Sequence, residues 1–313
     1  MKLSLVVPCY NEAENVQLFA AQAREILKGI EYETIYINDG SKDATIQKLK
    51  EIKAEGKDNL TIINFSRNFG KEAGLYAGLQ HATGDYVVII DADLQQPISV
   101  AREMYEFLEA NEEYDEVAAY QAERKEGKVL TMFKSAFYGL INKMSDVELY
   151  KNASDFRCLR RTVVDAILSM TEYHRFSKGI FAWVGFNTYY RPYEVQERHA
   201  GTTSWSFFKL LNYALEGMIS FSTKPLRMVT TLGIGTSVIA MFYMIIVILQ
   251  KLIFGIDVPG YPTIIVLILL LGGIQLTVMG IIGEYLAKIH IEVKSRPIYI
   301  AKEVIRSEKK EEV

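Results

Sequence analysis

The sequence predicts an α/β domain followed by a two-helix membrane anchor, and two patterns along its 313 residues lead to this prediction. In the first part of the chain, short apolar runs typical of strands alternate with stretches of helical periodicity, which indicates a parallel sheet. In the last part, long apolar segments indicate a change of solvent. The expected strands cover residues 3–7, 33–38, 60–65, 85–91 and 115–120, and the expected helices cover residues 12–28, 43–55, 71–82 and 97–110.

The two apolar segments, Val229–Leu249 and Thr263–Gly283, contain no charged residue. At a rise of about 1.5 Å per residue, each is long enough to cross roughly 30 Å of hydrocarbon. Buried helices of a soluble core are the less favoured alternative. Basic residues flank the pair on its outer sides, and the positive-inside rule then places both termini in the cytoplasm. These basic residues are Lys224, Arg227, Lys288, Lys294 and Arg296.

Four regions follow from this pattern. We expect a cytoplasmic catalytic domain over residues 1–204, an interfacial helix and linker over 205–228, the two spans over 229–289 (about 229–250 and 263–284) and a charged tail over 290–313. The segment 121–204 contains an expected helix at 130–145 and is interpreted as acceptor-side structure. Residues 205–221 place apolar groups on one side at helical spacing, which is typical of a helix in the membrane interface, or alternatively of one packed on the soluble domain. We expect the tail beyond Pro297 to be a solvated helix or disordered.

Charge, cysteine content and the N-terminus narrow the class of protein. A net charge of -3 and a pI near 5.9 argue against nucleic acid as a partner, because binding its phosphates needs a broad basic surface. Cys9 and Cys158 match no disulfide or zinc spacing, so we expect core residues in a reducing compartment. The apolar run Leu3–Val7 ends at Pro8 and is too short for a signal peptide. The expected location is therefore the inner (cytoplasmic) membrane, with the first domain in the cytoplasm.

Polar residues follow the first two expected strands. Pro8 leads into Tyr10 and Glu12, where the aromatic ring can stack on a nucleobase and the carboxylate can accept hydrogen bonds from ribose hydroxyls. After the second strand, Asp39 can accept from the imide N–H of uracil, and Gly40 allows a close turn. A turn with a capped helix is an equally good interpretation of each motif taken alone.

The clearest signal follows the fourth strand, which leads directly into Asp91 and Asp93. If this segment is extended, residues two apart point the same way, and both carboxylates can face one cation. Oxygen ligands suit Mg²⁺ or Mn²⁺, which can stabilise negative charge on a departing nucleoside diphosphate. A purely structural carboxylate pair is disfavoured by the cost of burying it. Lys71, in the segment Ser66–Lys71, could contact phosphate or form a surface ion pair.

The ordered motifs VVPCYNEAEN, INDGSKD, SRNFGKEAG and DADLQQP resemble glycosyltransferase family 2. Within it, the chain resembles the polyprenyl-phosphate glycosyltransferases, which include dolichol-phosphate mannose synthases and bactoprenol glucosyltransferases. The match continues through SDFRCLRR, HRFSKGIFAWVGF, ERHAGTTSW and the two spans, and the bactoprenol branch is the more similar. The resemblance implies a GT-A (Rossmann-like, nucleotide-sugar-binding) fold, an inverting reaction and a divalent cation held by Asp91 and Asp93. Gln95 is a candidate for a further ligand.

The resemblance also places Asp155 near the reacting centre. Because a lipid phosphate is already largely ionised, Asp155 is expected to orient the acceptor or the sugar hydroxyls, with a structural salt bridge to Arg157 as the alternative. Arg198 matches a family arginine that binds phosphate. Many relatives carry a lysine where this chain has Ser204, so phosphate neutralisation would fall on Arg198, Arg175 or Arg124. Trp183 lines a sugar or lipid channel or belongs to the core.

The expected reaction is displacement at the anomeric carbon of a UDP-sugar by a polyprenyl-phosphate oxygen. Glucose is the first choice of sugar, and N-acetylated hexosamines, galactose and mannose stay open. Use of the product outside the cell would require a separate flippase and a second, downstream transferase. One rival is a processive polysaccharide synthase, but the chain shows no Q-x-x-R-W element. The other is a non-catalytic nucleotide-sugar-binding scaffold. The lipid bilayer is an expected partner, and a homo-oligomer stays open.

Overall fold

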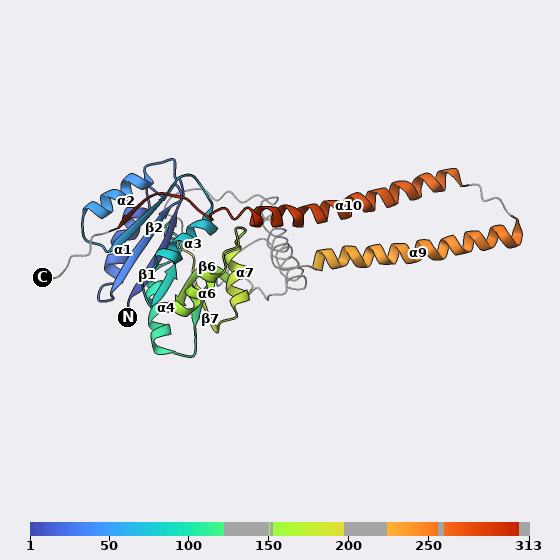
Figure 1. The fold of residues 1–313 in the computed structure, drawn as a ribbon. Helices are drawn as coiled ribbons and strands as arrows, with labels where there is room; N and C mark the ends of the chain where they lie inside the picture. Colours follow the sequence, from blue (N-terminus) through green and yellow to red (C-terminus); the bar gives the residue numbers. More distant parts are fainter. Residues whose placement is uncertain (122–149, 151–152, 197–223, 256–259, 307–313) are drawn as a thin grey trace.

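The computed structural model describes residues 1–121, 150, 153–196, 224–255 and 260–306 (Figure 1). The strands are β1 (Leu3–Cys9), β2 (Tyr32–Asn38), β3 (Leu60–Phe65), β4 (Tyr86–Ile89), β5 (Glu116–Gln121), β6 (Ala153–Arg160), β7 (Thr188–Tyr193) and β8 (Ala301–Arg306). The helices are α1 (Val16–Ile26), α2 (Thr45–Ala54), α3 (Lys71–His81), α4 (Ile98–Ala110), α6 (Arg161–Ser169), α7 (Ser177–Val184), α9 (Lys224–Phe254) and α10 (Tyr261–Val293). The helix expected at 130–145 and the interfacial helix expected at 205–221 lie outside the described residues.

The strands form one mixed sheet in the order β7-β5-β6-β4-β1-β2-β3-β8. Strands β1 to β4 are parallel, as expected, but β6 pairs antiparallel with both β4 and β5, and β8 pairs antiparallel with β3. The prediction of a purely parallel sheet is therefore wrong. Local periodicity cannot reveal this order, because β6 follows β5 in the chain but inserts between β4 and β5. As a result, the amino end of β6 lies at the carboxyl edge of β1 to β4.

Helices cover both faces of the sheet and give a three-layer domain. On one face, apolar side chains of α1, α2 and α4 pack against the strands. On the other face, the packing helices are α3, α6 and α7. Strand residues are buried on both sides because of this double cover, which explains their continuous apolar runs. Cys9 and Cys158 are buried and unpaired within this core, as expected.

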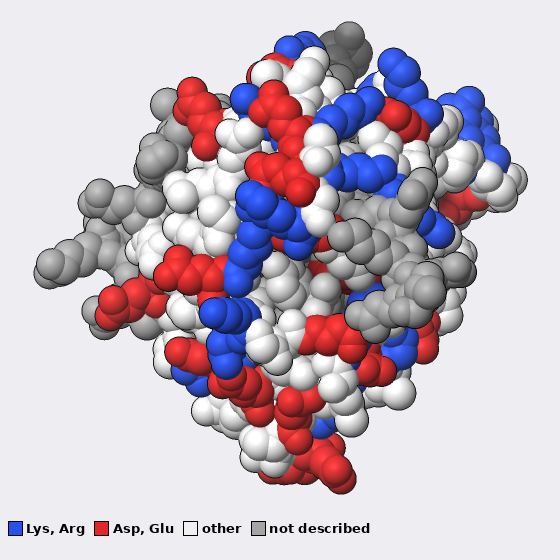
Figure 2. All heavy atoms as spheres, turned by 90° about the vertical axis from the view of Figure 1, so that its left-hand side faces the viewer, with Lys and Arg blue, Asp and Glu red and all other residues white. Residues whose placement is uncertain are grey.

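Acidic and basic side chains are interspersed on the face of this domain that points away from the long helices. Figure 2 shows the two colours alternating across this face. The chain carries 35 basic and 38 acidic residues, so the mixture reflects a composition close to balance.

The two long helices, α9 and α10, run side by side away from the α/β domain (Figure 1). Both contain segments that are long and apolar enough to cross a membrane, Leu226–Ile253 and Val266–Val293, and none of the most apolar part of either is buried in the protein. These exposed apolar helices form a candidate membrane anchor, and the alternative of two buried core helices is wrong. Each helix is longer than its apolar segment predicted, because flanking polar residues continue the helical turns.

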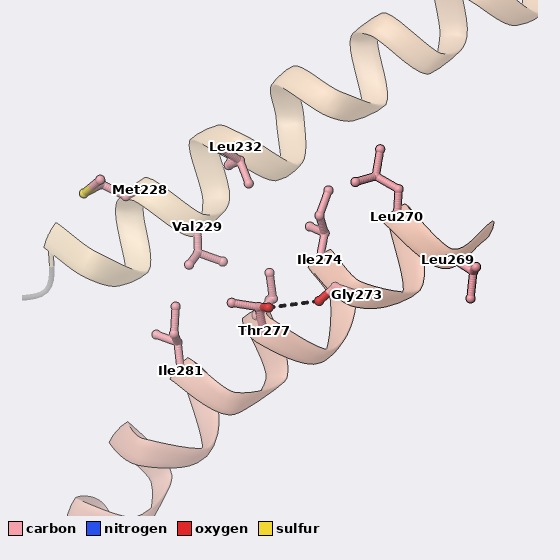
Figure 3. A pocket seen from close by; sticks show the side chains of 10 residues that line it. Met228, Val229, Leu232, Leu269, Leu270, Gly273, Ile274, Thr277 and Ile281 are labelled. Atoms are coloured by element: carbon pink, nitrogen blue, oxygen red, sulfur yellow. Dashed lines mark hydrogen bonds between the residues drawn. The ribbon is translucent and has the colours of Figure 1, made fainter. Parts of the chain in front are cut away.

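The two helices leave an apolar groove of about 720 Å³ between them. Figure 3 shows its lining side chains, with Thr277 turned back on its own helix. The Thr277 hydroxyl donates to the carbonyl of Gly273 one turn earlier, at 2.9 Å. This bond satisfies the hydroxyl within the helix, which keeps the groove apolar.

The C-terminal segment returns from α10 to the sheet and forms its edge strand. Strand β8 pairs with β3 from Thr61↔Arg306 to Phe65↔Ala301. The expectation of a solvated helix or a disordered tail is therefore wrong for residues 301–306. The charged residues of this segment made it look unlike a strand. An edge strand tolerates charge on its exposed side, and it gains its hydrogen bonds from a partner that is distant in the sequence.

Candidate active site

Lys71 brings two carboxylates together at the carboxyl edge of the sheet. Its ammonium Nζ lies 2.8 Å from Asp91 Oδ1, 3.0 Å from Asp91 Oδ2 and 3.3 Å from Asp155 Oδ2. Asp91 follows β4, Asp155 is near the start of β6, and Lys71 is the first residue of α3. The antiparallel insertion of β6 is what places Asp155 beside residues that lie far away in the sequence. We call Lys71, Asp91 and Asp155 the carboxyl-edge cluster.

The charges of this cluster shift the protonation equilibria of its members. Burial alone raises the pKa of Asp155, but the nearby charges of Lys71 and Lys178 outweigh it and hold that pKa below its ordinary value. Burial alone lowers the pKa of Lys71, but Asp91 and Asp155 outweigh this effect and raise it. Both groups are therefore charged at neutral pH. The Lys71 side chain is 41% exposed, so its ammonium can be reached from solvent.

The ion pair of Asp155 differs from the structural alternative considered for it. Arg157 Nη1 lies 2.8 Å from Glu116 Oε1, and this pair is almost fully buried. The Arg157 guanidinium also lies over the ring of Phe181, 4.3 Å from the ring centroid, which is within the range of a cation–π contact. Asp155 is therefore paired with Lys71, and the alternative of a structural salt bridge to Arg157 is wrong.

Asp91 follows the end of β4 directly, and Asp93 lies in a turn. Strand β4 ends at Ile89, and Leu94 has a left-handed backbone with φ 62°. The extended alternation that was expected to point both carboxylates the same way therefore does not continue through Asp93. Asp93 is buried and accepts the backbone N–H of Gln95 at 3.1 Å, whereas Asp91 faces Lys71. Their joint binding of a cation stays a prediction.

Gln96, which was not among the expected site residues, holds Asp91 with two hydrogen bonds. Its carbonyl Oε1 accepts the Asp91 backbone N–H at 2.9 Å, and its Nε2 donates to Asp91 Oδ2 at 3.0 Å. Gln96 is itself buried. The neighbouring Gln95, expected as a further metal ligand, is partly exposed, and its backbone carbonyl accepts the N–H of Gln196. The sequence held a signal in the QQ pair, but it could not tell which amide turns inward.

Asp39 holds the loop that presents Lys71. Its two carboxylate oxygens accept the backbone N–H groups of Phe69 at 2.6 Å and Gly70 at 3.0 Å. Burial raises the pKa of Asp39, and these two bonds oppose the rise. The adjacent Gly40 has φ 64°, and a Cβ there would lie 2.4 Å from the backbone carbon of Arg67. Only glycine therefore allows this loop to pack so closely. The expected contact of Asp39 with a base stays a prediction.

The residues expected in and after the first strand lie at the same carboxyl edge of the sheet. Pro8 lies in β1 opposite Ile37, and Tyr10 follows with 43% of its surface exposed. An exposed ring beside the sheet edge is available for stacking. Glu12 accepts the side-chain amide of Asn15 at 2.6 Å, and its backbone N–H donates to Thr45. The loop therefore leaves the Tyr10 ring exposed, whereas the Glu12 carboxylate already accepts one hydrogen bond.

Glu72 lies behind the carboxyl-edge cluster and links it to α7. The Ser177 backbone N–H donates to Glu72 Oε2 at 3.0 Å, and the Ser177 hydroxyl donates to the same oxygen. Burial and the nearby Asp155 raise the pKa of Glu72 to about 7. This role could not be predicted from the sequence, because Glu72 looks like an ordinary acidic residue of a first helical turn.

Five other residues named from the sequence have different outcomes. Arg175 donates to the carbonyls of Met170 and Ile167 at the end of α6, and its guanidinium lies 4.6 Å from the centroid of the Tyr76 ring. Its donors are thus partly used within the domain. Trp183 is 61% exposed, so the interpretation as a core tryptophan is wrong. Arg198, Arg124 and Ser204 lie outside the described residues.

The arrangement is suited to holding a cation and a phosphate-bearing ligand. Asp91 and Asp93 supply hard oxygen donors, and Lys71 already shows that positive charge is held at this edge. Among the residues that the structure describes, no three acidic, histidine or cysteine side chains form a preformed metal cage. Mg²⁺ does not need one, because it usually takes one or two carboxylates and completes its shell with phosphate oxygens and water. The residues therefore fit a divalent cation bound together with a diphosphate.

Comparison with known proteins identifies the family. The model of the family described as "Glycosyl transferase family 2" matches residues 4–168. The chain belongs to glycosyltransferase family 2. It is therefore a glycosyltransferase, and its three-layer domain is a GT-A-like mixed-sheet α/β fold. The resemblance drawn from the sequence motifs is thereby confirmed.

Relatives match this glycosyltransferase over nearly its whole length. It is 44% identical over 308 residues to the prophage bactoprenol glucosyl transferase homolog of Escherichia coli (strain K12), with 97% of this chain and 99% of the relative covered. It is 44% identical over 306 residues to the bactoprenol glucosyl transferase of Shigella phage SfII, with 96% and 98% covered. A similar solved structure is glucosyl-3-phosphoglycerate synthase from Mycobacterium tuberculosis in complex with Mn²⁺, UDP-glucose and phosphoglyceric acid, with a TM-score of 0.46, 17% identity, and 70% of this chain and 77% of that chain covered.

Proposed function

We propose that this glycosyltransferase transfers a hexose, with glucose from UDP-glucose as first choice, to undecaprenyl or another polyprenyl phosphate with inversion at the anomeric carbon. The observation that carries the proposal is the carboxyl-edge cluster, which lies in a domain whose edge strand β8 is continuous with the apolar helix α10. The bactoprenol glucosyl transferases that match the chain support a lipid phosphate as the acceptor.

The donor would bind along the carboxyl edge of β1, β2 and β4. Tyr10 would stack on the base, while Glu12 and Asp39 would accept hydrogen bonds from the ribose and the base. Asp91 and Asp93 would hold Mg²⁺ or Mn²⁺, with Gln95 as a candidate for a further ligand. When bound, the metal supplies electrostatic stabilisation of the diphosphate.

Lys71 and Asp155 would act on the two reacting partners. The partly exposed side chain of Lys71 can turn from the carboxylates to a phosphate oxygen of the donor, since the described residues hold its ammonium by ion pairs with Asp91 and Asp155. Asp155, freed from Lys71, would accept a hydrogen bond from a sugar hydroxyl and so orient the sugar. It need not remove a proton from the acceptor, because a phosphate monoester is already ionised at neutral pH. Arg198 would bind the acceptor phosphate.

The acceptor would reach the site from the bilayer. Lys224 and Arg227 at the start of α9, and Lys288, Lys294 and Arg296 near the end of α10, carry positive charge at the domain end of the two helices. By the positive-inside rule, this end and both termini would be cytoplasmic, with α9 and α10 spanning the inner membrane. The product would carry its sugar on the cytoplasmic side, so a separate flippase and a downstream transferase would be needed for use outside.

The test uses the purified full-length chain in lipid nanodiscs with undecaprenyl phosphate and labelled UDP-sugars. We expect label in the lipid fraction with Mg²⁺ or Mn²⁺, most with UDP-glucose, and none with EDTA. NMR of the isolated lipid should show a β-linked sugar. Transfer that continues with EDTA would contradict the metal requirement, and a water-soluble polymer as product would contradict the lipid acceptor.

A further inference from the structure

The cytoplasmic end of α10 contacts the catalytic domain at two places, and we call residues 292–301 the anchor joint. At the first place, the carboxylate of Glu292 accepts the backbone N–H of Tyr173 at 2.9 and 3.2 Å and that of His174 at 3.3 Å. One acidic side chain on the apolar helix thus holds two successive amides of the catalytic domain. Hydrogen bonds to a charged acceptor are stronger than those between neutral groups.

The segment that Glu292 holds leads directly to the active site. After Tyr173 and His174 the chain enters α7, whose first residue is Ser177. Ser177 donates twice to Glu72, and Glu72 follows Lys71 of the carboxyl-edge cluster in the chain. A displacement of the loop before α7 is therefore transmitted by short, bonded steps to the residues beside Asp155.

At the second place, the anchor joint contacts the end of β3, shortly before Lys71 in the chain. The ring of Tyr299 stacks on Phe65 with 4.9 Å between centroids, and the Ile300 carbonyl accepts the N–H of Ser66 at 2.9 Å. Phe65 in turn contacts Phe69 edge to face at 5.6 Å. These residues belong to the end of β3 and the loop that presents Lys71. The joint therefore contacts the segment that leads directly to this lysine.

The joint is also short and folded. Helix α10 ends at Val293 and β8 begins at Ala301, which leaves only residues 294–300 between them. Ser295 takes a left-handed backbone with φ 47°, and Ile298 and Tyr299 pack against the apolar core on the α3 face. A connection this short, with packed side chains, does not behave as a flexible linker. It restricts how the domain can turn relative to α10.

We propose that Glu292 and Tyr299 are positioning residues that fix the orientation of the carboxyl edge relative to the membrane helices. The inference rests on the proposed function, in which the acceptor phosphate is held at the bilayer surface. That phosphate reaches the sugar only if the carboxyl edge of the sheet faces it at the right height above the membrane. Misplacement of a reacting group by about 1 Å can cost up to about 100-fold in rate, so a rigid joint matters for an acceptor that cannot leave the membrane.

The test compares two acceptors with the full-length protein in nanodiscs. For Glu292→Ala we expect kcat/KM for undecaprenyl phosphate in the bilayer to fall about tenfold. With a short-chain, water-soluble prenyl phosphate, the same variant should stay within about twofold of the wild type, because this acceptor approaches from solution. Glu292→Gln should recover most of the loss, since its amide oxygen still accepts an N–H. The matched control is Glu303→Ala, which removes a surface carboxylate of β8 that pairs with Lys50.

Variants of Tyr299 test the inference independently of Glu292. Tyr299→Phe loses the exposed hydroxyl bond to Gln80 Oε1 but keeps the ring against Phe65, so it should behave as the wild type. Tyr299→Leu should show the same selective loss with the bilayer acceptor. Equal losses with both acceptors, or no loss with either, would overturn the inference. A wild type that glycosylates neither prenyl phosphate would instead refute the proposed function, so the two failures are distinguishable.

Discussion

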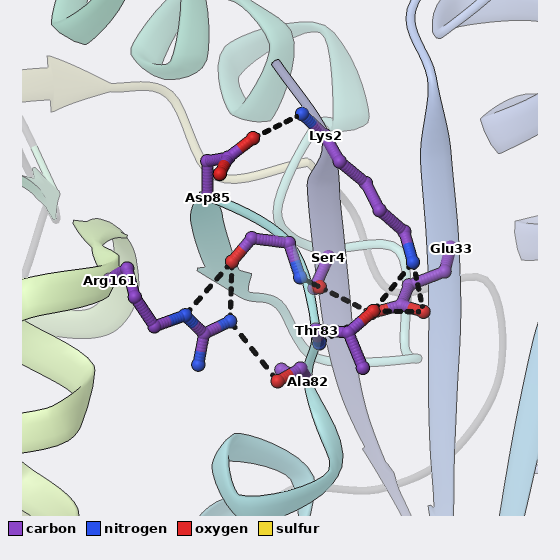
Figure 4. Close-up of polar contacts among 8 residues, drawn as sticks. Lys2, Ser4, Glu33, Ala82, Thr83, Asp85 and Arg161 are labelled. Atoms are coloured by element: carbon purple, nitrogen blue, oxygen red, sulfur yellow. Dashed lines mark hydrogen bonds and ion pairs between the residues drawn. The ribbon is translucent and has the colours of Figure 1, made fainter.

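Two polar clusters lie at opposite edges of the same sheet, and they use similar residues differently. At the amino edge, Glu33 accepts hydrogen bonds from Lys2 Nζ at 2.8 Å, Ser4 Oγ at 2.6 Å and the Thr83 N–H at 2.7 Å. Figure 4 shows these side chains converging between β1, β2 and the start of β4, with Arg161 bound to nearby carbonyls. We call Lys2, Ser4, Glu33 and Thr83 the amino-edge cluster.

The difference lies in the number of donors that each carboxylate has. In the amino-edge cluster, one buried carboxylate has several donors; burial alone raises the pKa of Glu33, but the bonds outweigh it and lower that pKa. In the carboxyl-edge cluster, two carboxylates share the ammonium of Lys71, whose side chain is 41% exposed, and Asp91 accepts one further hydrogen bond, from Gln96 Nε2. In the amino-edge cluster, the Glu33 carboxylate is surrounded by hydrogen-bond donors, and the cluster stabilises the fold. The carboxyl-edge cluster leaves negative charge that a cationic or phosphate-bearing ligand can rearrange, as expected of an active site.

The largest expected effect comes from removing the carboxylates at the carboxyl edge. For the double variant Asp91→Asn, Asp93→Asn we expect sugar transfer to fall about 1,000-fold or more, because the side chains proposed to hold the metal lose their charge. The melting temperature should change little, since loss of negative charge also relieves repulsion. Radiolabelled transfer and a thermal melt of the same preparation measure both.

The matched control for this double variant is Asp85→Asn at the opposite edge. Asp85 accepts the backbone N–H of Lys2 at 2.8 Å, and an amide oxygen can replace it there. Its transfer activity should remain within about twofold of the wild type, as for surface changes remote from a site. Wild-type turnover by the double variant would show that the carboxyl-edge acids have no part in the reaction.

A smaller loss is expected from Lys71→Met. We expect transfer to fall about 10- to 100-fold, because a cation that can contact phosphate is lost while the carboxylates remain. In addition, Asp91 and Asp155 would face each other without the ammonium between them. Added Mg²⁺ should therefore raise the melting temperature of the variant more than that of the wild type.

Lys2→Met provides the contrast, because it removes the ammonium of the amino-edge cluster. It should lower the melting temperature but leave both transfer and the response to Mg²⁺ unchanged. An equal gain from Mg²⁺ in the wild type and in Lys71→Met would show that Lys71 does not neutralise the acids that the metal meets.

The parts of the fold that local pattern determines could be predicted from the sequence. The first five strands show short apolar runs, the first four helices show helical periodicity, and the two long helices show unbroken apolar runs. Strands β6, β7 and β8 were missed because their formation depends on distant partners. Nothing in the segment Ala301–Arg306, which carries three charged residues among six, indicates that it will pair with β3.

The candidate site shows the same limit at the level of side chains. Asp91, Asp155 and Lys71 could be singled out from motifs, because each lies at an element boundary in a recognisable sequence. The family resemblance placed Asp155 near the reacting centre, but the residues themselves carry no local signature of this convergence, since it depends on β6 inserting beside β4. Gln96 and Glu72 were missed because burial and hydrogen-bond partners, which define their roles, have no local signature.

At the amino edge, a change should affect stability and leave chemistry intact. Glu33→Gln keeps the shape of the side chain but places an amide NH₂ among donors, so we expect a loss of about 1–2 kcal/mol in the free energy of unfolding. The melting temperature should fall by about 2–6 °C. Measured on folded protein, kcat/KM of the variant should match that of the wild type. A fall in kcat/KM together with the fall in stability would show that the amino-edge cluster also contributes to catalysis.

The smallest effect concerns pH and Glu72, which lies between the carboxyl-edge cluster and α7. Its pKa is raised from 4.5 to about 7 by burial and by Asp155, while the Ser177 donors and Lys71 oppose the rise. The folded protein therefore holds this proton more tightly than the unfolded chain. The stabilisation is complete below about pH 4.5 and is lost as the pH rises through about 7.

Glu72→Gln removes this titration, because the amide stays neutral and its oxygen can still accept from Ser177. We expect the melting temperature of the variant, relative to the wild type, to be higher at pH 8 than at pH 5 by about 2–4 °C. Glu51→Gln, which alters an exposed carboxylate on α2 that pairs with Lys48, is the control. A gap between Glu72→Gln and the wild type that is the same at both pH values would mean that Glu72 does not titrate between pH 5 and pH 8, which would contradict a pKa of about 7.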